Sequence, residues 1–267
     1  MVAIINFFTV VTFSAGSGKR LRPKTYLEPK LLVKVGRKTI FDFTVRFFIE
    51  SFLCKKCYIV FRERRRRYLS ILKKFTCVEL VKNFFPPESH CASSLYSVYK
   101  KLDGGVLFFN SDLILNKPNL NYILKEISNT KLSLIFGINN SSVEPDCDLQ
   151  RAKISKKGRV VSWSMELNDF DSYITGPFYL CGKDVKLMKG LLDKRHKNDV
   201  INLPCFTFFS ELIDEVEINF REINAFGFAE IDNLQDLNLS LYKKWVQWFS
   251  VMLKHKYALK LEFTSII

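Results

Sequence analysis

Two glycines and five basic side chains lie close together near the start of the chain, in the segment SAGSGKRLRPKTYLEPK at residues 14–30. The apolar run Val2–Phe13 directly precedes this segment. Glycine lets backbone N–H groups approach an anion closely, and lysine and arginine side chains add positive charge. The combination predicts a loop that follows a buried strand and binds phosphate groups.

Two common phosphate-binding loops do not fit this segment. A Walker A loop reads GxxxxGK[ST], but Arg20 replaces its hydroxyl residue and Phe13 occupies the position of its first glycine. The dinucleotide fingerprint GxGxxG fails because Leu21 stands at its third glycine. An ordinary basic surface loop does not account for the prolines that bracket the charges, or for the apolar run that follows Lys30.

Residues 16–25 and 29–32 resemble the GxGxRLxPxT…PKxL signature of nucleotidyltransferases, and the resemblance covers roughly residues 3–240. Enzymes of this family join a nucleoside triphosphate to a phosphorylated sugar or alcohol and release pyrophosphate. The resemblance implies that Arg20 holds the triphosphate and that Lys30 bridges the α-phosphate and the acceptor. It also implies nucleotide contacts from the loop itself, namely from Ala15, Gly16, Ser17, Gly18 and Lys19.

Two later segments extend the same resemblance. Asn110-Ser111-Asp112 follows the apolar run 104–110 and resembles the strand-end aspartate of the family, and residues 228–237, FAEIDNLQDL, resemble its W-x-E-I-D-T-x-E-D-L segment. The resemblance implies that Asp112 and Asp232 bind Mg²⁺, a hard cation suited to carboxylate and phosphate oxygens, and that Ser111 contacts the nucleotide. A phosphate nucleophile is already ionised near neutral pH, so the reaction needs no general base.

The segment before the metal strand resembles one subgroup of the family. Asn83 and Ser94-Leu95-Tyr96 resemble bacterial phosphocholine cytidylyltransferases and the related aminoethylphosphonate enzymes, although His90-Cys91 replaces the Asn-Asn pair of that subgroup. The resemblance implies CTP as the nucleotide, bound in part by Asn83 and Ser94. We therefore expect transfer of CMP to a small phosphorylated alcohol, amine or sugar, for decoration of a capsule or another surface glycan.

The acceptor side departs further from the family pattern. Residues 159–166 resemble a "GrV…SKE" segment, but Met165 stands where a phosphate-binding lysine is common. Lysines at 153, 156, 157 or 183 are candidates to replace that charge. Residues 173–179 resemble an acceptor-side G-x-Y strand, although a plain core strand accounts for them equally well. The acceptor-binding residues implied by the resemblance are Glu166, Gly176, Tyr179 and Glu230.

Short apolar runs alternate with helical patterns through the first half of the 267 residues, which indicates right-handed crossovers and an α/β fold. We expect a single Rossmann-like three-layer α/β/α domain with a mixed, mostly parallel central sheet and a smaller β-hairpin acceptor subregion. Its parts are a nucleotide-binding half (1–115), an acceptor-binding half (116–240) and a C-terminal helical extension (241–267). The patterns predict helices at 40–53, 64–74, 93–102, 120–128 and 234–259, and strands at 3–13, 56–61, 78–81, 104–110, 132–138, 152–154, 159–164, 173–181, 216–221 and 226–231.

The apolar runs and the cysteines of the sequence indicate where the protein is located and whether it holds a structural zinc ion. No apolar run reaches the ~18–20 residues of a membrane-spanning helix. No basic residue precedes Val2–Phe13, so we interpret this run as a buried strand and not a signal peptide, and we expect a cytoplasmic protein. The lone CxxC at 54–57 lacks a second pair for zinc, so we expect the seven cysteines to be buried, reduced thiols.

Three alternatives stay open from the sequence. The first is a hexose-1-phosphate uridylyl- or thymidylyltransferase. The second is an inactive homologue that acts as a binding or regulatory subunit, which Met165 and the altered Asn pair suggest. The third is nucleic-acid binding through the RERRRR run at 62–67, in a chain whose net charge is +14. No aromatic residues alternate with these arginines to stack bases, so we favour a solvent-exposed helix face for this run. The sequence does not decide between a monomer and a homodimer.

Overall fold

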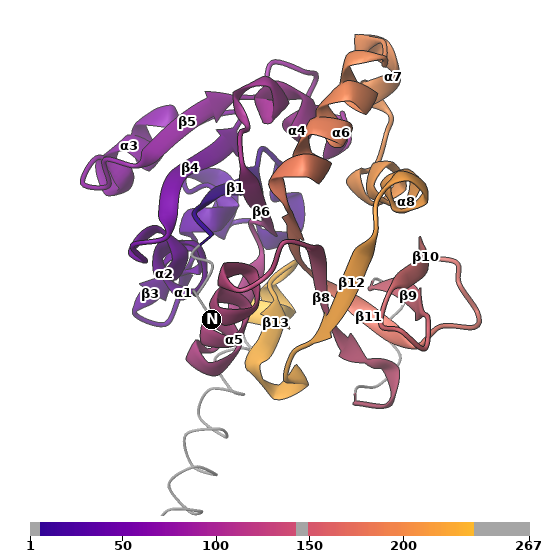
Figure 1. The fold of residues 1–267 in the computed structure, drawn as a ribbon. Helices are drawn as coiled ribbons and strands as arrows, with labels where there is room; N and C mark the ends of the chain where they lie inside the picture. The colour runs from indigo at the N-terminus through magenta and orange to yellow at the C-terminus, as the bar shows by residue number, and fades with distance from the viewer. Residues whose placement is uncertain (1–5, 143–148, 238–267) are drawn as a thin grey trace, which may run out of the picture.

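The computed structural model describes residues 6–142 and 149–237 (Figure 1). The predicted extension at 241–267 lies outside the described residues, as does most of the predicted helix at 234–259. Within the described residues, no helix is both long enough and apolar enough to cross a membrane.

A nine-stranded mixed sheet forms the centre of the molecule. Its first part is parallel, in the order β6, β1, β4, β5, and β1 pairs with both β4 and β6. In its second part β11 runs antiparallel to β6, β8 and β9, while β12 runs parallel to β8. This arrangement confirms the expected mixed sheet. The strands are β1 (Phe8–Ser14), β4 (Cys54–Phe61), β5 (Val78–Lys82), β6 (Gly105–Asn110), β8 (Ser133–Asn139), β9 (Gln150–Ile154), β10 (Val160–Ser164), β11 (Ser172–Leu180) and β12 (Ile218–Glu222).

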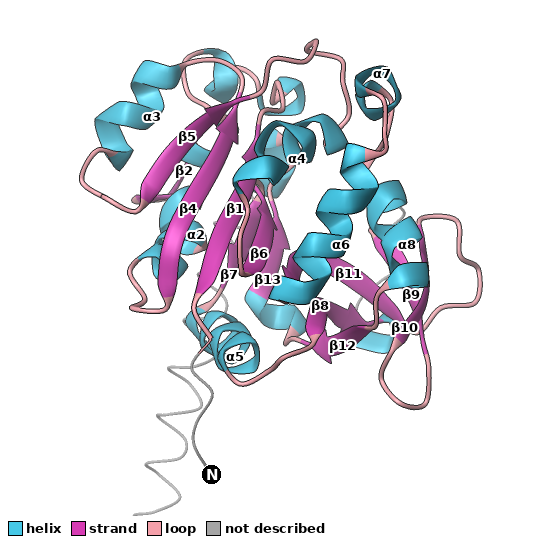
Figure 2. Cartoon of the chain, turned by 45° about the horizontal axis from the view of Figure 1, so that its top comes forward, coloured by secondary structure: helices cyan, strands magenta, loops and turns pink. Residues whose placement is uncertain are grey.

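Helices cover both faces of this sheet and give the expected three layers. Successive residues of a strand point to opposite faces, so Val10 belongs to one apolar core and Val11 to the other. Figure 2 shows α4, α6 and α8 together on one side of the sheet. The first face packs against α1 (Ile40–Phe43), α2 (Val45–Ile49), α3 (Arg65–Leu72) and α5 (Lys117–Ser128), and the second against α4 (Ala92–Val98), α6 (Gly182–Asp193), α7 (Lys197–Ile201) and α8 (Cys205–Glu215).

The helices differ from the sequence prediction in two respects. The predicted helix at 40–53 is interrupted at Thr44, whose hydroxyl donates a hydrogen bond to the carbonyl oxygen of Leu113 at 2.8 Å. The helices α6, α7 and α8 were not predicted. In α6, Val185, Met188 and Leu192 are buried at helical spacing, so their periodicity was the pattern that could have identified it.

Two short ribbons complete the fold, and one of them is important for the site. β2 (Lys34–Val35) pairs with β3 (Lys38–Thr39). β7 (Leu113–Leu115) pairs antiparallel with β13 (Phe228–Glu230), with Glu230 opposite Leu113. This second ribbon joins segments that are more than a hundred residues apart in the sequence, and it fixes the residues that follow β6 against those that follow β13.

Gly105 lies against a tyrosine ring, which gives a prediction about stability. A Cβ atom at Gly105 would lie 2.3 Å from the Oη of Tyr179. Because a buried clash of this kind forces side-chain and backbone shifts, we expect Gly105→Ala to lower the free energy of unfolding by roughly 1–3 kcal/mol in urea titrations. Gly190→Ala is the control, since it meets nothing within 4 Å in α6. Equal stability of Gly105→Ala and the wild type would contradict the prediction, and Tyr179→Leu should relieve the clash.

Candidate active site

The glycine loop is held in shape by local contacts. Gly18 has a φ of 61°, in the left-handed region that favours glycine, and a Cβ there would lie 2.9 Å from Thr25 Cγ2. The hydroxyl of Thr25 donates a hydrogen bond to the carbonyl oxygen of Gly18 at 2.7 Å. Leu21 anchors the loop in the apolar core, while Gly16 has open space around it. The backbone of the loop is therefore fixed by packing, with Gly16 accessible from the cleft.

Arg62 ties this loop to the opposite wall of the cleft, a role that the sequence did not indicate. Its guanidinium donates hydrogen bonds to the carbonyl oxygens of Ala15, at 3.1 Å, and Phe85, and to the hydroxyl of Ser89 at 3.2 Å. The helix α3 starts only at Arg65, so the expectation that the whole run 62–67 belongs to a surface helix is wrong for Arg62. The pattern that could have indicated its role is an arginine at the carboxyl end of a strand that neighbours β1.

Lys30 lies at the centre of a cluster of charges. Its ammonium group donates to Asp112 Oδ2 at 2.8 Å and to Asp232 Oδ1 at 2.6 Å, and Arg20 forms an ion pair with Asp232 at 3.3 Å. Leu31 and Leu32 are buried and fix the start of this segment. Burial lowers the pKa of Lys30, but the carboxylates of Asp112 and Asp232 outweigh this effect and raise it above its ordinary value. Lys30 is therefore a permanent positive charge between two carboxylates.

The ribbon of β7 and β13 brings the two aspartates together. Asp112 directly precedes β7, and its carbonyl oxygen accepts a hydrogen bond from the backbone N–H of Ile231 at 3.0 Å. The carboxylate of Asp236 accepts hydrogen bonds from the N–H groups of Asp232, at 2.8 Å, and Asn233, at 3.0 Å. The sequence DNLQD thus folds into a tight turn that aims Asp232 at Lys30.

The two carboxylates fit a divalent cation. Asp112 Oδ1 is buried and has no hydrogen-bond partner, whereas Oδ2 accepts from Lys30. A buried carboxylate oxygen without a donor is costly unless a cation is bound there. The described residues contain no group of three or more His, Cys, Asp or Glu side chains placed to hold a metal. A cation at Asp112 and Asp232 would therefore complete its coordination with phosphate oxygens and water, as Mg²⁺ does in phosphoryl-transfer sites.

A cleft of about 430 Å³ contains the glycine loop and the charge cluster. Asn83, which we expected to contact the nucleotide, is not among the residues that line it. Its side-chain amide is buried and donates to the hydroxyls of Ser93, at 3.0 Å, and Ser94, at 3.1 Å, so it supports the wall from behind. The expected residues that do line the cleft are Ala15, Gly16, Ser17, Gly18, Lys19, Arg20, Lys30, Ser94, Ser111, Asp112 and Asp232.

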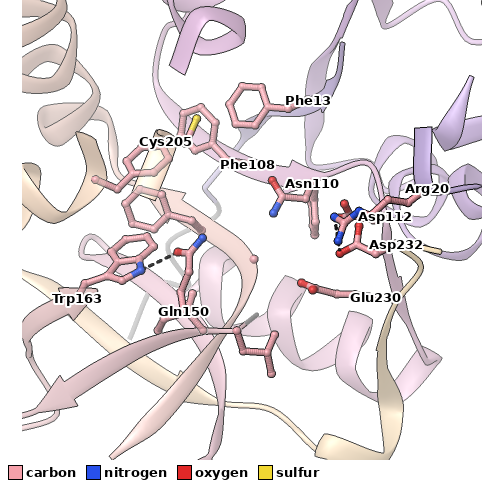
Figure 3. A pocket seen from close by; sticks show the side chains of 16 residues that line it. Phe13, Arg20, Phe108, Asn110, Asp112, Gln150, Trp163, Cys205, Glu230 and Asp232 are labelled. Atoms are coloured by element: carbon pink, nitrogen blue, oxygen red, sulfur yellow. Dashed lines mark hydrogen bonds and ion pairs between the residues drawn. The ribbon is translucent and has the colours of Figure 1, made fainter. Parts of the chain in front are cut away.

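A second cavity of about 230 Å³ lies beside this cleft and shares Arg20, Asp112 and Asp232 with it (Figure 3). Its far side is aromatic. Trp163 Nε1 donates to Gln150 Oε1 at 2.7 Å, and the Trp163 ring stacks on Phe209 at 6.0 Å between centroids. The sequence did not indicate this aromatic wall, because large apolar residues in strands and helices are usually residues of the hydrophobic core. The wall consists of Phe13, Phe108, Trp163, Phe178 and Phe209.

The expected acceptor residues fall into two groups. Gly176 and Glu230 line the second cavity. Tyr179 lines neither this cavity nor the nucleotide cleft. On β11 it belongs to the apolar core on the opposite face from Phe178, and its hydroxyl lies near Gly105. Glu166 is exposed on the turn after β10 and lines neither cavity.

None of the lysines suggested as replacements for the charge missing at Met165 lines the second cavity. Lys153 is paired with Asp169 at 2.6 Å, and Lys183 lies in a separate hollow together with Tyr179. Arg20 lines both cavities, and Lys30 lines the cleft and contacts Asp112 and Asp232, which the two cavities share. These two side chains are therefore the ones placed to neutralise a phosphate there.

Comparison with known proteins gives a family match over slightly more than half of the chain. The family model described as nucleotidyl transferase matches residues 9–148. A search of curated protein sequences gives no significant match.

Solved structures agree with the fold at low sequence identity. The CTP:phosphocholine cytidylyltransferase from Streptococcus pneumoniae superposes with a TM-score of 0.72 at 20% identity, over 87% of this chain and 96% of that one. A putative glucose-1-phosphate thymidylyltransferase from Bacillus anthracis gives 0.71 at 13% identity, over 88% and 94%. The inositol-1-phosphate CTP transferase from T. maritima gives 0.69 at 14% identity, over 88% and 95%.

Proposed function

Because this chain belongs to the nucleotidyl transferase family, we propose that it transfers CMP from CTP to a small phosphorylated alcohol or amine and releases pyrophosphate. The observation that supports this most directly is the contact of Lys30 with both Asp112 and Asp232, at 2.8 and 2.6 Å, beside the glycine loop. One cleft thereby combines a loop suited to phosphate binding with the ammonium group of Lys30 and the carboxylates of Asp112 and Asp232. We propose that the reaction takes place in the cytoplasm and supplies an activated group for a surface glycan.

The proposed reaction brings two anions together, so its barrier is mainly one of charge and position. The phosphate of the acceptor attacks the α-phosphorus of the nucleotide, and the bond to the leaving pyrophosphate breaks. In our proposal the N–H groups of the glycine loop and Arg20 hold the triphosphate. Lys30 lies next to both cavities, where its ammonium can neutralise the α-phosphate and the attacking oxygen.

Asp112 and Asp232 would hold Mg²⁺ in this proposal. The ion would neutralise the phosphate oxygens as charge moves toward the pyrophosphate. The unpartnered Oδ1 of Asp112 supports this assignment. Lys30 and the ion would then share the same two carboxylates.

CTP is proposed as the nucleotide on two grounds. The sequence segment at 83–96 resembles cytidylyltransferases, and two of the structures compared above are named as CTP-dependent enzymes. The thymidylyltransferase with a similar TM-score is the reason why the test below includes every nucleotide.

The second cavity favours an acceptor with a positively charged group. Its charged lining residues are three acids, Asp112, Glu230 and Asp232, and one base, Arg20, in a chain whose net charge is +14. The aromatic wall faces the same space, and the faces of aromatic rings attract ammonium groups. A phosphorylated amino alcohol has the required combination, with its phosphate near Lys30 and its ammonium near the aromatic wall.

Pyrophosphate release tests the proposed function. Each of the four nucleoside triphosphates would be combined with phosphocholine, phosphoethanolamine, inositol 1-phosphate and glucose 1-phosphate in the presence of Mg²⁺. We expect the highest kcat/KM for CTP with one of the two amines. A preference for UTP or dTTP with glucose 1-phosphate would support the hexose-1-phosphate alternative instead, and turnover with no pair would support an inactive homologue.

Arg62 gives a prediction about nucleotide binding. Its three hydrogen bonds connect Ala15, in the glycine loop, to Phe85 and Ser89 on the opposite side of the cleft, so their loss should free the loop. Hydrogen bonds to a charged group contribute about 1.5–3 kcal/mol each. We expect Arg62→Ala to raise KM for the nucleotide roughly 10–100-fold with a smaller change in kcat, and Arg62→Lys to recover part of the loss. Arg66→Ala, an exposed residue of the same run, is the control. An unchanged KM in Arg62→Ala would show that the loop is fixed without it.

A further inference from the structure

Two cysteines that are far apart in the sequence meet where the two cavities join. The backbone N–H of Cys205 donates a hydrogen bond to Cys91 Sγ at 2.9 Å. Cys205 is the first residue of α8 (Cys205–Glu215), so the sulfur of Cys91 lies at the N-terminus of that helix. The positive end of the helix dipole favours a negative charge at this position.

Cys91 differs from the other described cysteines in exposure and in acidity. It is exposed to solvent, which corrects the expectation that the cysteines are buried. The hydrogen bond from the side chain of Cys205, together with backbone N–H groups at Cys205, Cys91 and Ala92, lowers the pKa of Cys91. Burial raises the pKa of Cys54 to about 12 and raises that of Cys77. Because the thiolate is the reactive form, we expect Cys91 to be the most reactive of the described thiols.

The pair lies in the wall between the two sites. Cys91 lines the nucleotide cleft together with Ser89, His90 and Ser94, and Cys205 lines the acceptor cavity (Figure 3). A covalent link between them would join the start of α4 to the start of α8. Both elements border space that the proposed substrates must enter.

We propose that Cys91 is a site of reversible oxidation by hydrogen peroxide, and that it forms a disulfide with Cys205 in the wall between the two cavities, which lowers turnover. In the first step the Cys91 thiolate attacks one oxygen of the peroxide. The O–O bond breaks, hydroxide leaves and takes up a proton to become water, and Cys91 becomes a sulfenic acid. In the second step the sulfur of Cys205 attacks the sulfenic sulfur, the S–O bond breaks, and the hydroxyl group leaves as water with the proton of the Cys205 thiol.

The two sulfurs together lose two electrons to the peroxide, and a dithiol reductant reverses the change. The chemistry at the cysteines depends only on their mutual contact and on the exposure of Cys91. The effect on turnover rests in addition on the proposed function, because it assumes that nucleotide and acceptor occupy the two cavities.

The first experiment measures the thiols without any assay of activity. The full chain would be alkylated with iodoacetamide near neutral pH, and each cysteine followed by peptide mass spectrometry. We expect Cys91 to react at least tenfold faster than Cys77, and hydrogen peroxide to produce a peptide pair linked through Cys91 and Cys205 with the loss of two hydrogen atoms. A Cys91 that is no faster than Cys77, or a disulfide confined to Cys54, Cys57 and Cys77, would overturn the proposal.

The second experiment compares turnover before and after peroxide treatment. In the wild type we expect at least a tenfold loss that dithiothreitol reverses. In Cys91→Ser and in Cys205→Ser the ratio of treated to untreated turnover should stay near one, whatever the starting rate of each variant, and Cys77→Ser should behave like the wild type. If the Cys91–Cys205 disulfide forms without a change in turnover or in nucleotide binding, the proposed effect of the disulfide on the enzyme is refuted. If no substrate pair is turned over at all, the function fails while the alkylation result still decides the thiol chemistry.

Discussion

Replacing Asp112 or Asp232 by asparagine is expected to reduce turnover by at least 10²–10³-fold, the loss seen when one preorganised charge contact of a transition state is removed. Each substitution keeps the size of the side chain and removes one of the negative charges that face Lys30 at 2.8 and 2.6 Å. The site would then hold Mg²⁺ with a single carboxylate. Initial rates over a range of Mg²⁺ concentrations would measure the loss, and we expect the concentration for half-maximal rate to rise.

The same variants should stay folded, since both carboxylates are partly accessible at the mouth of a cleft. Thermal unfolding of each variant would check this directly. Asp169→Asn is the matched control, because Asp169 also pairs with a lysine but lies on the surface, away from both cavities. Full activity in both Asp112→Asn and Asp232→Asn would refute the metal assignment, whereas a loss in only one would leave the other without a role in metal binding.

The fold could be predicted from the sequence because it depends on local patterns. Buried strands of a parallel sheet appear as apolar runs, as in GGVLFFN before Asp112, and a glycine loop after the first strand is visible from composition alone. The residues Arg20, Lys30, Asp112 and Asp232 were chosen through a motif whose spacing is kept in this chain. The structure brings these four into direct contact.

Two of the predicted site residues, Asn83 and Tyr179, line neither cavity, for a shared physical reason. Asn83 and Tyr179 are both in segments that border the site, but the direction of a side chain decides which space it enters. Asn83 turns inward to hold two serines, and Tyr179 falls on the other face of β11 from the cavity. A motif gives the position of a residue along the chain and leaves its direction undetermined when the register of the strand is unknown.

Residues that act through tertiary contacts left no local pattern. Arg62 was one arginine in a run of basic residues, and only the neighbouring ends of β1 and β4 make it a clamp on the glycine loop. Trp163 and Phe209 read as core residues, and indeed they pack on each other. Their role as a wall of the cavity follows from the space beside them, which depends on how β10 and α8 meet.

Lys30→Met should lower kcat by at least 10²-fold, because it removes the charge between the two carboxylates and keeps a side chain of similar length. Its effect on stability should depend on Mg²⁺. Without the ion, two partly buried carboxylates would face each other with no ammonium between them, so the variant should unfold at a lower temperature than the wild type. Differential scanning calorimetry with and without Mg²⁺ would measure this.

The direction of the Mg²⁺ effect separates a metal site from a purely structural ion pair. In the wild type the ion must share Asp112 and Asp232 with Lys30, whereas in Lys30→Met the remaining competitor is Arg20, which pairs with Asp232 alone. A ligand stabilises the folded state more when it binds more tightly, so Mg²⁺ should raise Tm by more in the variant than in the wild type. Lys153→Met, which loses a surface ion pair, should show the same Mg²⁺ effect as the wild type. If Mg²⁺ shifts Tm equally in Lys30→Met and in the wild type, the two carboxylates serve only to hold Lys30, and the chain must bind its metal through the nucleotide alone.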